Sequence, residues 1–289
     1  MSKIASALAG IFLTAHTLFA QADERDRNWN KPIQPVRIAG NLYYVGANEI
    51  TSYLITTPEG HFLLDGGFVE TAPLIQRNIE QLGFKLSDVK ILLNSHAHFD
   101  HAGGLAELKK VTGAKFVASE GDAELLRHGG HGDFRFGDRL AFPPIVPDRV
   151  IHDGETVELG DQVMTAHLTP GHTKGDTTWS ARIRDGSKTY DVVFVGSQSS
   201  LDYKFIGEES YPGILSDFEK SFATLNRLPC DIFLASHGNF FDLMEKHERV
   251  LRGESNVFVD PDGYRNYLRE SEKDFRDKLA KQKQDAASK

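Results

Sequence analysis

Four residues of types that bind zinc lie close together between positions 96 and 101 of the chain. They are His96, His98, Asp100 and His101, and they follow the apolar, strand-like stretch Val89–Leu93. Imidazole nitrogens and carboxylate oxygens are common zinc ligands in proteins. Side chains two apart in an extended segment point the same way, so His96 and His98 can hold one ion. Asp100 and His101 can then turn toward a second ion.

Two further histidines follow strand-like stretches later in the chain. His172 lies in a Pro-Gly-His-Thr turn after Val163–Leu168, and His237 comes soon after Ile232–Leu234. Layered α/β folds usually place their chemistry in loops at the carboxyl ends of strands. A catalytic zinc site keeps one coordination position open, so six ligand-type residues on three such loops make two sets of three. The sequence therefore predicts a two-metal site.

The overall composition is that of an ordinary globular protein. The chain has 289 residues, 40% of them hydrophobic, and a formal net charge of −8. These values argue against disorder and against a protein that binds the nucleic-acid backbone, so no nucleic-acid partner is expected. The single cysteine, Cys230, excludes a disulfide framework within the chain and any multi-cysteine zinc module, and is most simply a buried, inert thiol.

The first residues resemble a secretory signal. Lys3 precedes the apolar run Ile4–Leu13, and an Ala-x-Ala cleavage signal ends at Ala22. A membrane anchor is the alternative, but a spanning helix needs roughly 20 apolar residues, more than this run provides. We therefore expect residues 1–22 to be removed and residues 23–289 to form one domain, exported to the periplasm and without membrane attachment.

Strand-like and helix-like patterns alternate from about residue 36, twice over. The expected strands are Leu42–Val45, Ser52–Thr56, His61–Leu64, Val89–Leu93, Thr156–Leu159, Val163–Leu168, Asp191–Val195 and Ile232–Leu234. Helical spacing is found at Leu74–Leu82, Leu105–Val111 and Phe218–Leu228, and in a C-terminal helix from about residue 260. This order predicts an α/β fold whose sheets are sandwiched between layers of helices.

The order of these motifs resembles the metallo-β-lactamase superfamily, over most of the chain from about Trp29 to Phe241. The resemblance implies the four-layer αβ/βα sandwich of that superfamily and two Zn²⁺ ions per chain. The first zinc would be held by His96, His98 and His172, and the second zinc by Asp100, His101 and His237.

The segment after Asp191–Val195 distinguishes branches of this superfamily. Glyoxalase-type and lactonase-type relatives have a metal-bridging Asp there, whereas this chain has Gly196–Ser199 and no carboxylate. The commonest β-lactamase subclass has a Cys ligand at that place, and here the only cysteine is Cys230. A serine at this place, together with His101 as a ligand, resembles subclass 3 of the class B β-lactamases.

This resemblance implies a hydrolase that opens the β-lactam ring of penicillins, cephalosporins and carbapenems and so confers antibiotic resistance. Metal-bound hydroxide would attack the lactam carbonyl directly, without a covalent acyl-enzyme, and Asp100 would orient the attacking water. Ser197 and Ser199 would bind the substrate carboxylate. The partner is thus a small-molecule β-lactam, and a monomer is favoured. The alternatives are a lactonase or thioesterase on the same scaffold, or a zinc-binding protein without catalysis.

Several residues around the motifs allow more than one interpretation. Asp65 is either a turn former or an acceptor for the second N–H of a ligand histidine. The loop expected at 127–147 is either a wall or lid of the site or a plain surface insertion. Trp29 and Phe134 are candidates for apolar walls at the mouth of the site.

Overall fold

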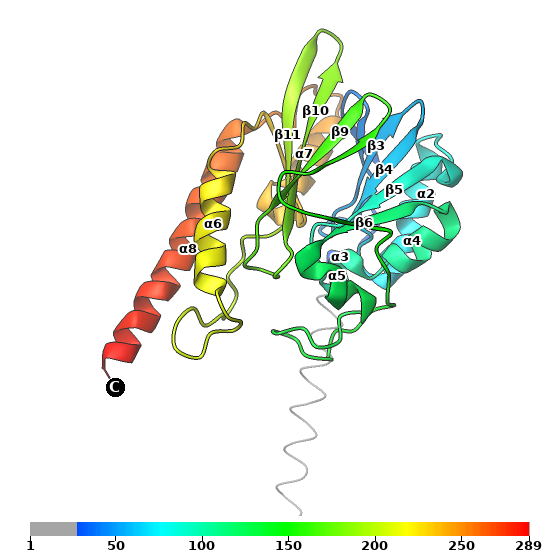
Figure 1. The fold of residues 1–289 in the computed structure, drawn as a ribbon. Coiled ribbons are helices and arrows are strands. Elements are labelled where there is room, and N and C mark those ends of the chain that lie inside the picture. Colours follow the sequence, from blue (N-terminus) through cyan, green and yellow to red (C-terminus); the bar gives the residue numbers. More distant parts are fainter. Residues whose placement is uncertain (1–27, 289) are drawn as a thin grey trace, which may run out of the picture.

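The computed structural model describes residues 28–288. Two β-sheets face each other, and helices cover their outer sides (Figure 1). The expected α/β sandwich is thereby confirmed. The expected signal segment, residues 1–22, lies outside the described residues.

The first sheet has seven strands that neighbour one another in chain order. The first four are antiparallel neighbours, and the last four are parallel neighbours. The strands are β1 (Val36–Ala39), β2 (Leu42–Tyr44), β3 (Tyr53–Thr57), β4 (Gly60–Leu64), β5 (Val89–Leu93), β6 (Lys115–Ser119) and β7 (Arg149–Ile151).

The second sheet has five strands in the order β12-β11-β10-β9-β8. Only the pair of β11 and β12 is parallel among them. The strands are β8 (Thr156–Leu159), β9 (Gln162–Leu168), β10 (Thr177–Asp185), β11 (Lys188–Val195) and β12 (Ile232–Ala235).

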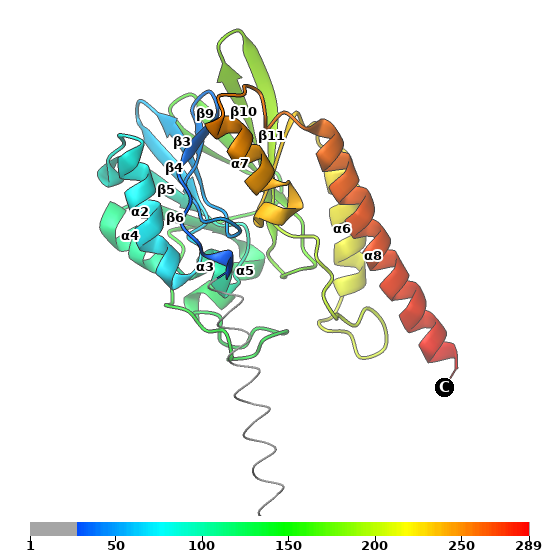
Figure 2. The same cartoon turned by 180° about the vertical axis from the view of Figure 1, so that it is seen from behind.

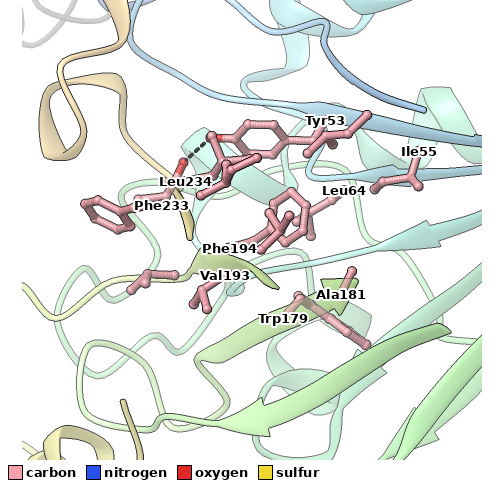
Figure 3. Close-up of a cluster of buried hydrophobic side chains, with 14 of the residues drawn as sticks. Tyr53, Ile55, Leu64, Trp179, Ala181, Val193, Phe194, Phe233 and Leu234 are labelled. Carbon is pink, nitrogen blue, oxygen red and sulfur yellow. Dashed lines mark hydrogen bonds between the residues drawn. The ribbon is translucent and has the colours of Figure 1, made fainter. Parts of the chain in front are cut away.

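The main hydrophobic core lies between the two sheets. Successive side chains of β3 alternate between this core, which takes Tyr53 and Ile55, and a second core that takes Leu54. The strand is buried on both faces because the sheet lies between two layers. Figure 3 shows the Tyr53 ring beside Phe194 of the second sheet. The Tyr53 hydroxyl donates a hydrogen bond to the carbonyl oxygen of Ala235 at 2.6 Å.

Helices cover the outer face of each sheet, as Figures 1 and 2 show from opposite sides. Side chains of α2 and α4 form the second core with the first sheet, and α6 and α8 pack side by side next to the second sheet. The helices are α2 (Ala72–Gln81), α3 (Phe99–Ala102), α4 (Leu105–Thr112), α5 (Glu120–Arg127), α6 (Ile214–Leu225), α7 (Leu243–Leu251) and α8 (Pro261–Ala287), with 3-10 turns at Val69–Thr71, Leu86–Asp88 and Gly238–Phe240.

The long helix α8 begins where the sequence predicts. Pro261 occupies its first turn, and the Asp260 side chain accepts a hydrogen bond from the backbone N–H of Gly263 at 2.8 Å. This cap satisfies one of the N–H groups left free at a helix start. No helix within residues 28–288 is both long and apolar enough to cross a membrane.

Candidate metal centre

The loops that carry the six predicted ligands meet at one edge of the two sheets. His96 and His98 follow β5, and the short helix α3 adds Asp100 and His101. His172 comes from the loop between β9 and β10, and His237 follows β12 after one residue, Ser236.

The six side chains form two adjoining groups. In each group one ligand atom per residue lies within 4.8 Å of the others, and the groups are His96, His98 and His172, and Asp100, His101 and His237. The rings of His96 and His101, one from each group, have centroids 4.3 Å apart. In each group, two residues come from the segment that follows β5 of the first sheet, and one comes from a loop of the second sheet. Each group therefore spans the boundary between the sheets.

The second group is compact. Nε2 of His101 lies 3.2 Å from Nε2 of His237. Oδ2 of Asp100 lies 3.6 Å from the first of these nitrogens and 3.7 Å from the other. Two nitrogens and one carboxylate oxygen therefore point at a common centre.

The far nitrogens of two histidines are occupied by oxygen partners. Nδ1 of His172 donates to the carbonyl oxygen of Ser199 at 2.9 Å, and Nδ1 of His96 lies 3.1 Å from Oγ of Ser95. These contacts leave the Nε2 lone pairs of both rings free to bind an ion, because a neutral imidazole has one donor and one acceptor nitrogen.

Two more histidines face carboxylates at longer distances, without a hydrogen bond. Nδ1 of His101 lies 4.0 Å from Oδ2 of Asp65, and Nδ1 of His237 lies 3.4 Å from Oε1 of Glu49. Metal-bound imidazoles usually have such a partner on the second nitrogen. The structure thus places Asp65 beside a candidate ligand, as one of its two interpretations predicts.

The donor set fits a divalent cation such as zinc. Nε2 of His96 is buried and has no hydrogen-bond partner among the described residues. Burial lowers the pKa of His96 well below its usual value and the pKa of His101 to about 3, so both rings are neutral, the form that binds metals. Burial alone would raise the pKa of Asp100, but the neighbouring imidazoles outweigh it and hold that pKa below its ordinary value.

The buried carboxylate of Asp122, at the start of α5, joins two of the ligand loops. It accepts hydrogen bonds from the backbone N–H of Ala97 at 2.8 Å and of Gly175 at 3.0 Å, and from the hydroxyl of Thr173 at 3.0 Å. Burial raises the pKa of Asp122 to about 6, although these hydrogen bonds lower it. A Cβ atom at Gly175 would lie 2.2 Å from the backbone nitrogen of Asp122, so the close approach requires glycine.

The carboxylates of Asp65 and Asp176, like that of Asp122, accept hydrogen bonds from residues of the loops near the ligands. Oδ1 of Asp65 accepts the backbone N–H of Ser95 at 2.7 Å. Asp176 accepts the backbone N–H of Ser197 and the hydroxyl of Thr169, each at 2.9 Å. Sequence reasoning missed Asp122 and Asp176 as site residues. Asp176 lies four positions after His172, which was a usable signal, whereas Asp122 is distant in sequence from every predicted ligand.

A cleft of about 300 Å³ opens beside both groups. Trp29 lines it, with its ring edge-on to His237 at 5.3 Å between centroids, as predicted for an apolar wall. The prediction for Phe134 is wrong, because this ring packs against Tyr203 and Tyr211 in the core beside α6. Phe136 takes its place in the cleft.

The predicted carboxylate-binding serines also line the cleft. Ser197 is 1% exposed, and its Oγ accepts the backbone N–H of Ser199 at 3.2 Å. Ser199 is less buried. Arg135 is the one cationic side chain among the described residues that line this cleft, and its Nε lies 2.7 Å from Oδ1 of Asp202. Sequence reasoning did not single out Arg135.

Comparison with known proteins identifies the family to which this fold and site belong. A model of the metallo-beta-lactamase superfamily matches residues 45–237, and the chain belongs to that superfamily. Its structural neighbours are subclass B3 metallo-β-lactamases.

For two of these neighbours, the match to this chain covers nearly the whole length of the neighbour. The native FEZ-1 metallo-β-lactamase from Legionella gormanii is 45% identical with a TM-score of 0.85, and the match covers 88% of this chain and 98% of that one. BJP-1, a subclass B3 enzyme of Bradyrhizobium japonicum, is 37% identical with a TM-score of 0.83, covering 90% of this chain and 98% of that one.

Curated relatives in sequence have other activities. A hydroxyacylglutathione hydrolase of Maricaulis maris is 34% identical over 125 residues, which are 43% of this chain and 38% of that protein. The acyl-coenzyme A thioesterase MBLAC2 of Gallus gallus is 30% identical over 118 residues, 36% of this chain and 41% of that protein. The chain thus spans about two fifths of the length of these relatives. Family and site together support a metal-dependent hydrolase.

Proposed function

We propose that this chain is an exported zinc-dependent β-lactamase that hydrolyses penicillins, cephalosporins and carbapenems and thereby confers resistance to them. The observation that carries the proposal is the pair of adjoining ligand groups beside an open cleft. The likeness to subclass B3 β-lactamases, which extends over 98% of the length of FEZ-1 and of BJP-1, supports the choice of substrate.

Two zinc ions would occupy the two groups. The first would be held by His96, His98 and His172, and the second by Asp100, His101 and His237. Bound zinc supplies a Lewis acid for a carbonyl oxygen and lowers the pKa of a water ligand, so a nucleophile is available at neutral pH.

Asp100 has a second role in this proposal. Its pKa lies below the usual value, so the carboxylate is ionised at neutral pH and can accept a hydrogen bond from the attacking water. It also lines the cleft, where the substrate would lie. Asp100 would therefore orient the water as well as hold the second ion.

The cleft offers groups for the rest of the substrate. Ser197, Ser199 and the Arg135 guanidinium line it and would be donors for the carboxylate of a β-lactam. Trp29, beside His237, and Phe136, beside His98, would provide apolar surface for the substrate. Hydrolysis would proceed directly, without an acyl-enzyme.

A lactonase or thioesterase is the second candidate function. The curated relatives named as hydroxyacylglutathione hydrolases and as an acyl-coenzyme A thioesterase favour it. Against it, the residues Gly196–Ser199 after β11 include no carboxylate that could bridge two metals, as the glyoxalase-type branch has. A zinc-binding protein without catalysis is disfavoured, because the candidate ligands line an open cleft that a substrate could enter.

One side-by-side assay tests these candidates. The zinc-loaded protein is given a penicillin, a cephalosporin, a carbapenem, a homoserine lactone and an acyl-glutathione thioester, with and without chelator. We expect β-lactam hydrolysis that the chelator abolishes and added zinc restores. Turnover of the lactone or the thioester with inert β-lactams would overturn the proposal in favour of the second candidate.

A further inference from the structure

A buried carboxylate from the loop between α5 and β7 faces one of the candidate metal ligands. Oδ2 of Asp133 lies 3.6 Å from Nε2 of His98, and the two side chains are 4% and 5% exposed. Both atoms are buried, and neither has a hydrogen-bond partner among the described residues. A shortening of about half an ångström would make a hydrogen bond of ordinary length.

The other oxygen of the same carboxylate holds the loop. Oδ1 of Asp133 accepts the backbone N–H groups of Arg135 at 2.7 Å and of Phe136 at 2.6 Å. The ring of Phe136 in turn packs edge-on to the ring of His98, with centroids 5.0 Å apart. One carboxylate therefore connects a candidate ligand with the two loop residues that line the cleft.

The carboxylate of Asp133 determines which ring nitrogen of His98 carries the proton. An ionised carboxylate only accepts hydrogen bonds, so it favours His98 with its proton on Nε2. In a neutral ring the lone pair is then on Nδ1, and this nitrogen is left for an ion. The far nitrogens of the other four histidines of the centre likewise face oxygen atoms.

We infer that Asp133 is a positioning residue that holds the proton of His98 on Nε2 and its Nδ1 lone pair toward the first metal position. It thereby couples metal binding to the conformation of the loop that carries Arg135 and Phe136. The inference rests on the proposed role of His98 as a metal ligand.

The substitution Asp133→Asn tests this inference. The amide oxygen can still accept the two backbone N–H groups, so the loop keeps its anchor. The amide nitrogen, a donor, then faces Nε2 of His98 and favours the wrong tautomer, with the proton on Nδ1. We expect the substitution to lower the affinity for one of the two zinc ions about 10- to 100-fold. Competition with a chromophoric chelator measures this affinity.

Asp138→Asn is the matched control in the same loop. Oδ1 of Asp138 accepts the backbone N–H of Gly132 at 3.0 Å and lies 3.3 Å from Nδ1 of His131, so this carboxylate too holds the loop backbone and faces a histidine. Its side chain is 73% exposed, and His131 belongs to neither metal group. This variant should keep the zinc affinity of the unsubstituted protein.

Two further measurements separate positioning from mere structural support. In the metal-free full-length chain, ¹⁵N NMR of histidine should show the proton of His98 on Nε2, and on Nδ1 in Asp133→Asn. Added zinc should slow the hydrogen exchange of the amides of residues 135 and 136, and the substitution should remove this response.

A proton on Nδ1 of His98 in the unsubstituted protein would overturn the inference without any variant. Unchanged zinc affinity in a folded Asp133→Asn protein would overturn it as well. Failure of the unsubstituted protein to bind zinc would instead contradict the proposed function, so the two failures are distinguishable.

Discussion

Asp100 differs from the other five candidate ligands because it is a carboxylate among imidazoles. It is also the residue with two proposed roles, since it would hold the second ion and orient the attacking water. Its carboxylate lies 3.6 Å and 3.7 Å from the nearest nitrogens of His101 and His237. Removing it should therefore affect metal content and rate together.

The substitution Asp100→Ala should leave a folded protein with one zinc ion per chain in place of two. We expect kcat/KM for a β-lactam to fall about 10²- to 10⁴-fold, the usual loss when a proton-handling group is removed. Metal analysis and steady-state hydrolysis measure the two effects, with Asp138→Ala as the control. Two ions retained in the Asp100→Ala protein would contradict the ligand assignment.

Arg135 should contribute to substrate binding more than to the rate. A charged hydrogen bond contributes about 1.5–3 kcal/mol, so Arg135→Gln should raise KM for an anionic β-lactam about 10-fold or more. The turnover number should change little, because the contact is made equally in the bound substrate and in the transition state. Arg139→Gln is the control, since Arg139 belongs to the same loop but does not line the cleft. A fall in kcat with constant KM would assign Arg135 to the chemical step.

At the scale of elements, the ligand loops depend on a close approach between α5 and the segment before β10. A Cβ atom at Gly175 would lie 2.2 Å from the backbone nitrogen of Asp122, and backbone cannot move away as a flexible side chain can. We expect Gly175→Ala to reduce the free energy of unfolding by about 3 kcal/mol and to weaken zinc binding.

Gly186→Ala is the companion to that substitution. Gly186 lies between β10 and β11 with a φ of +62° and open space around it, so alanine should cost about 1 kcal/mol in backbone strain. Denaturant unfolding and zinc titration compare the two variants. Equal loss of stability with normal zinc affinity in both would show that the approach of Gly175 to Asp122 does not position the ligands.

Some elements could be predicted from sequence because their signals are local. The strands β5 and β8 have the expected bounds, since each is a short apolar or β-rich run. The strand β10 was missed, although Trp179, Ala181 and Ile183 alternate with polar residues along it. Arg182, Arg184 and Asp185 make the second half of the strand mostly polar, so no apolar run marks it in the sequence.

The residues of the site also fall into those with a local sequence signal and those without one. The His-x-His-x-Asp-His segment and the two later histidines follow recognisable strands, so their convergence could be predicted from fold class. The supporting residues Asp122 and Asp133 have no local signal, because tertiary packing alone brings them to Ala97 and His98. The directions of Phe134 and Phe136 depend on that packing too, so sequence alone selected the wrong one of the two rings.

At the scale of the whole molecule, each metal group joins the two sheets. A ligand that binds only the folded state stabilises it by about 2.7 kcal/mol when its concentration is 100 times its dissociation constant. Zinc should therefore raise the unfolding temperature by about 4–5 °C for a chain of this size. Calorimetry with chelator and with excess zinc measures the change, and magnesium, which prefers oxygen ligands, is the control. Identical unfolding temperatures in both conditions would contradict metal binding across the sheets.

The single thiol of the chain should be unreactive in the folded protein. Burial raises the pKa of Cys230 to about 12, and the thiolate is the reactive form. Alkylation at pH 8 should be on the order of 1000-fold slower than in guanidinium chloride, since the pKa is raised by about three units and each unit changes the thiolate fraction about tenfold. Mass spectrometry follows the reaction, and fast labelling of the native protein would show that the thiol is accessible.

The division of each ligand group between the sheets also determines when a metal can be acquired during biosynthesis. Four of the six donors leave the ribosome together, but His172 comes 71 residues after His101, and His237 comes 65 residues later still. The first group is complete once His172 is in place, whereas the second also needs His237, which follows the last strand, β12. We therefore expect the second metal position to form last, in the compartment where the chain completes its folding.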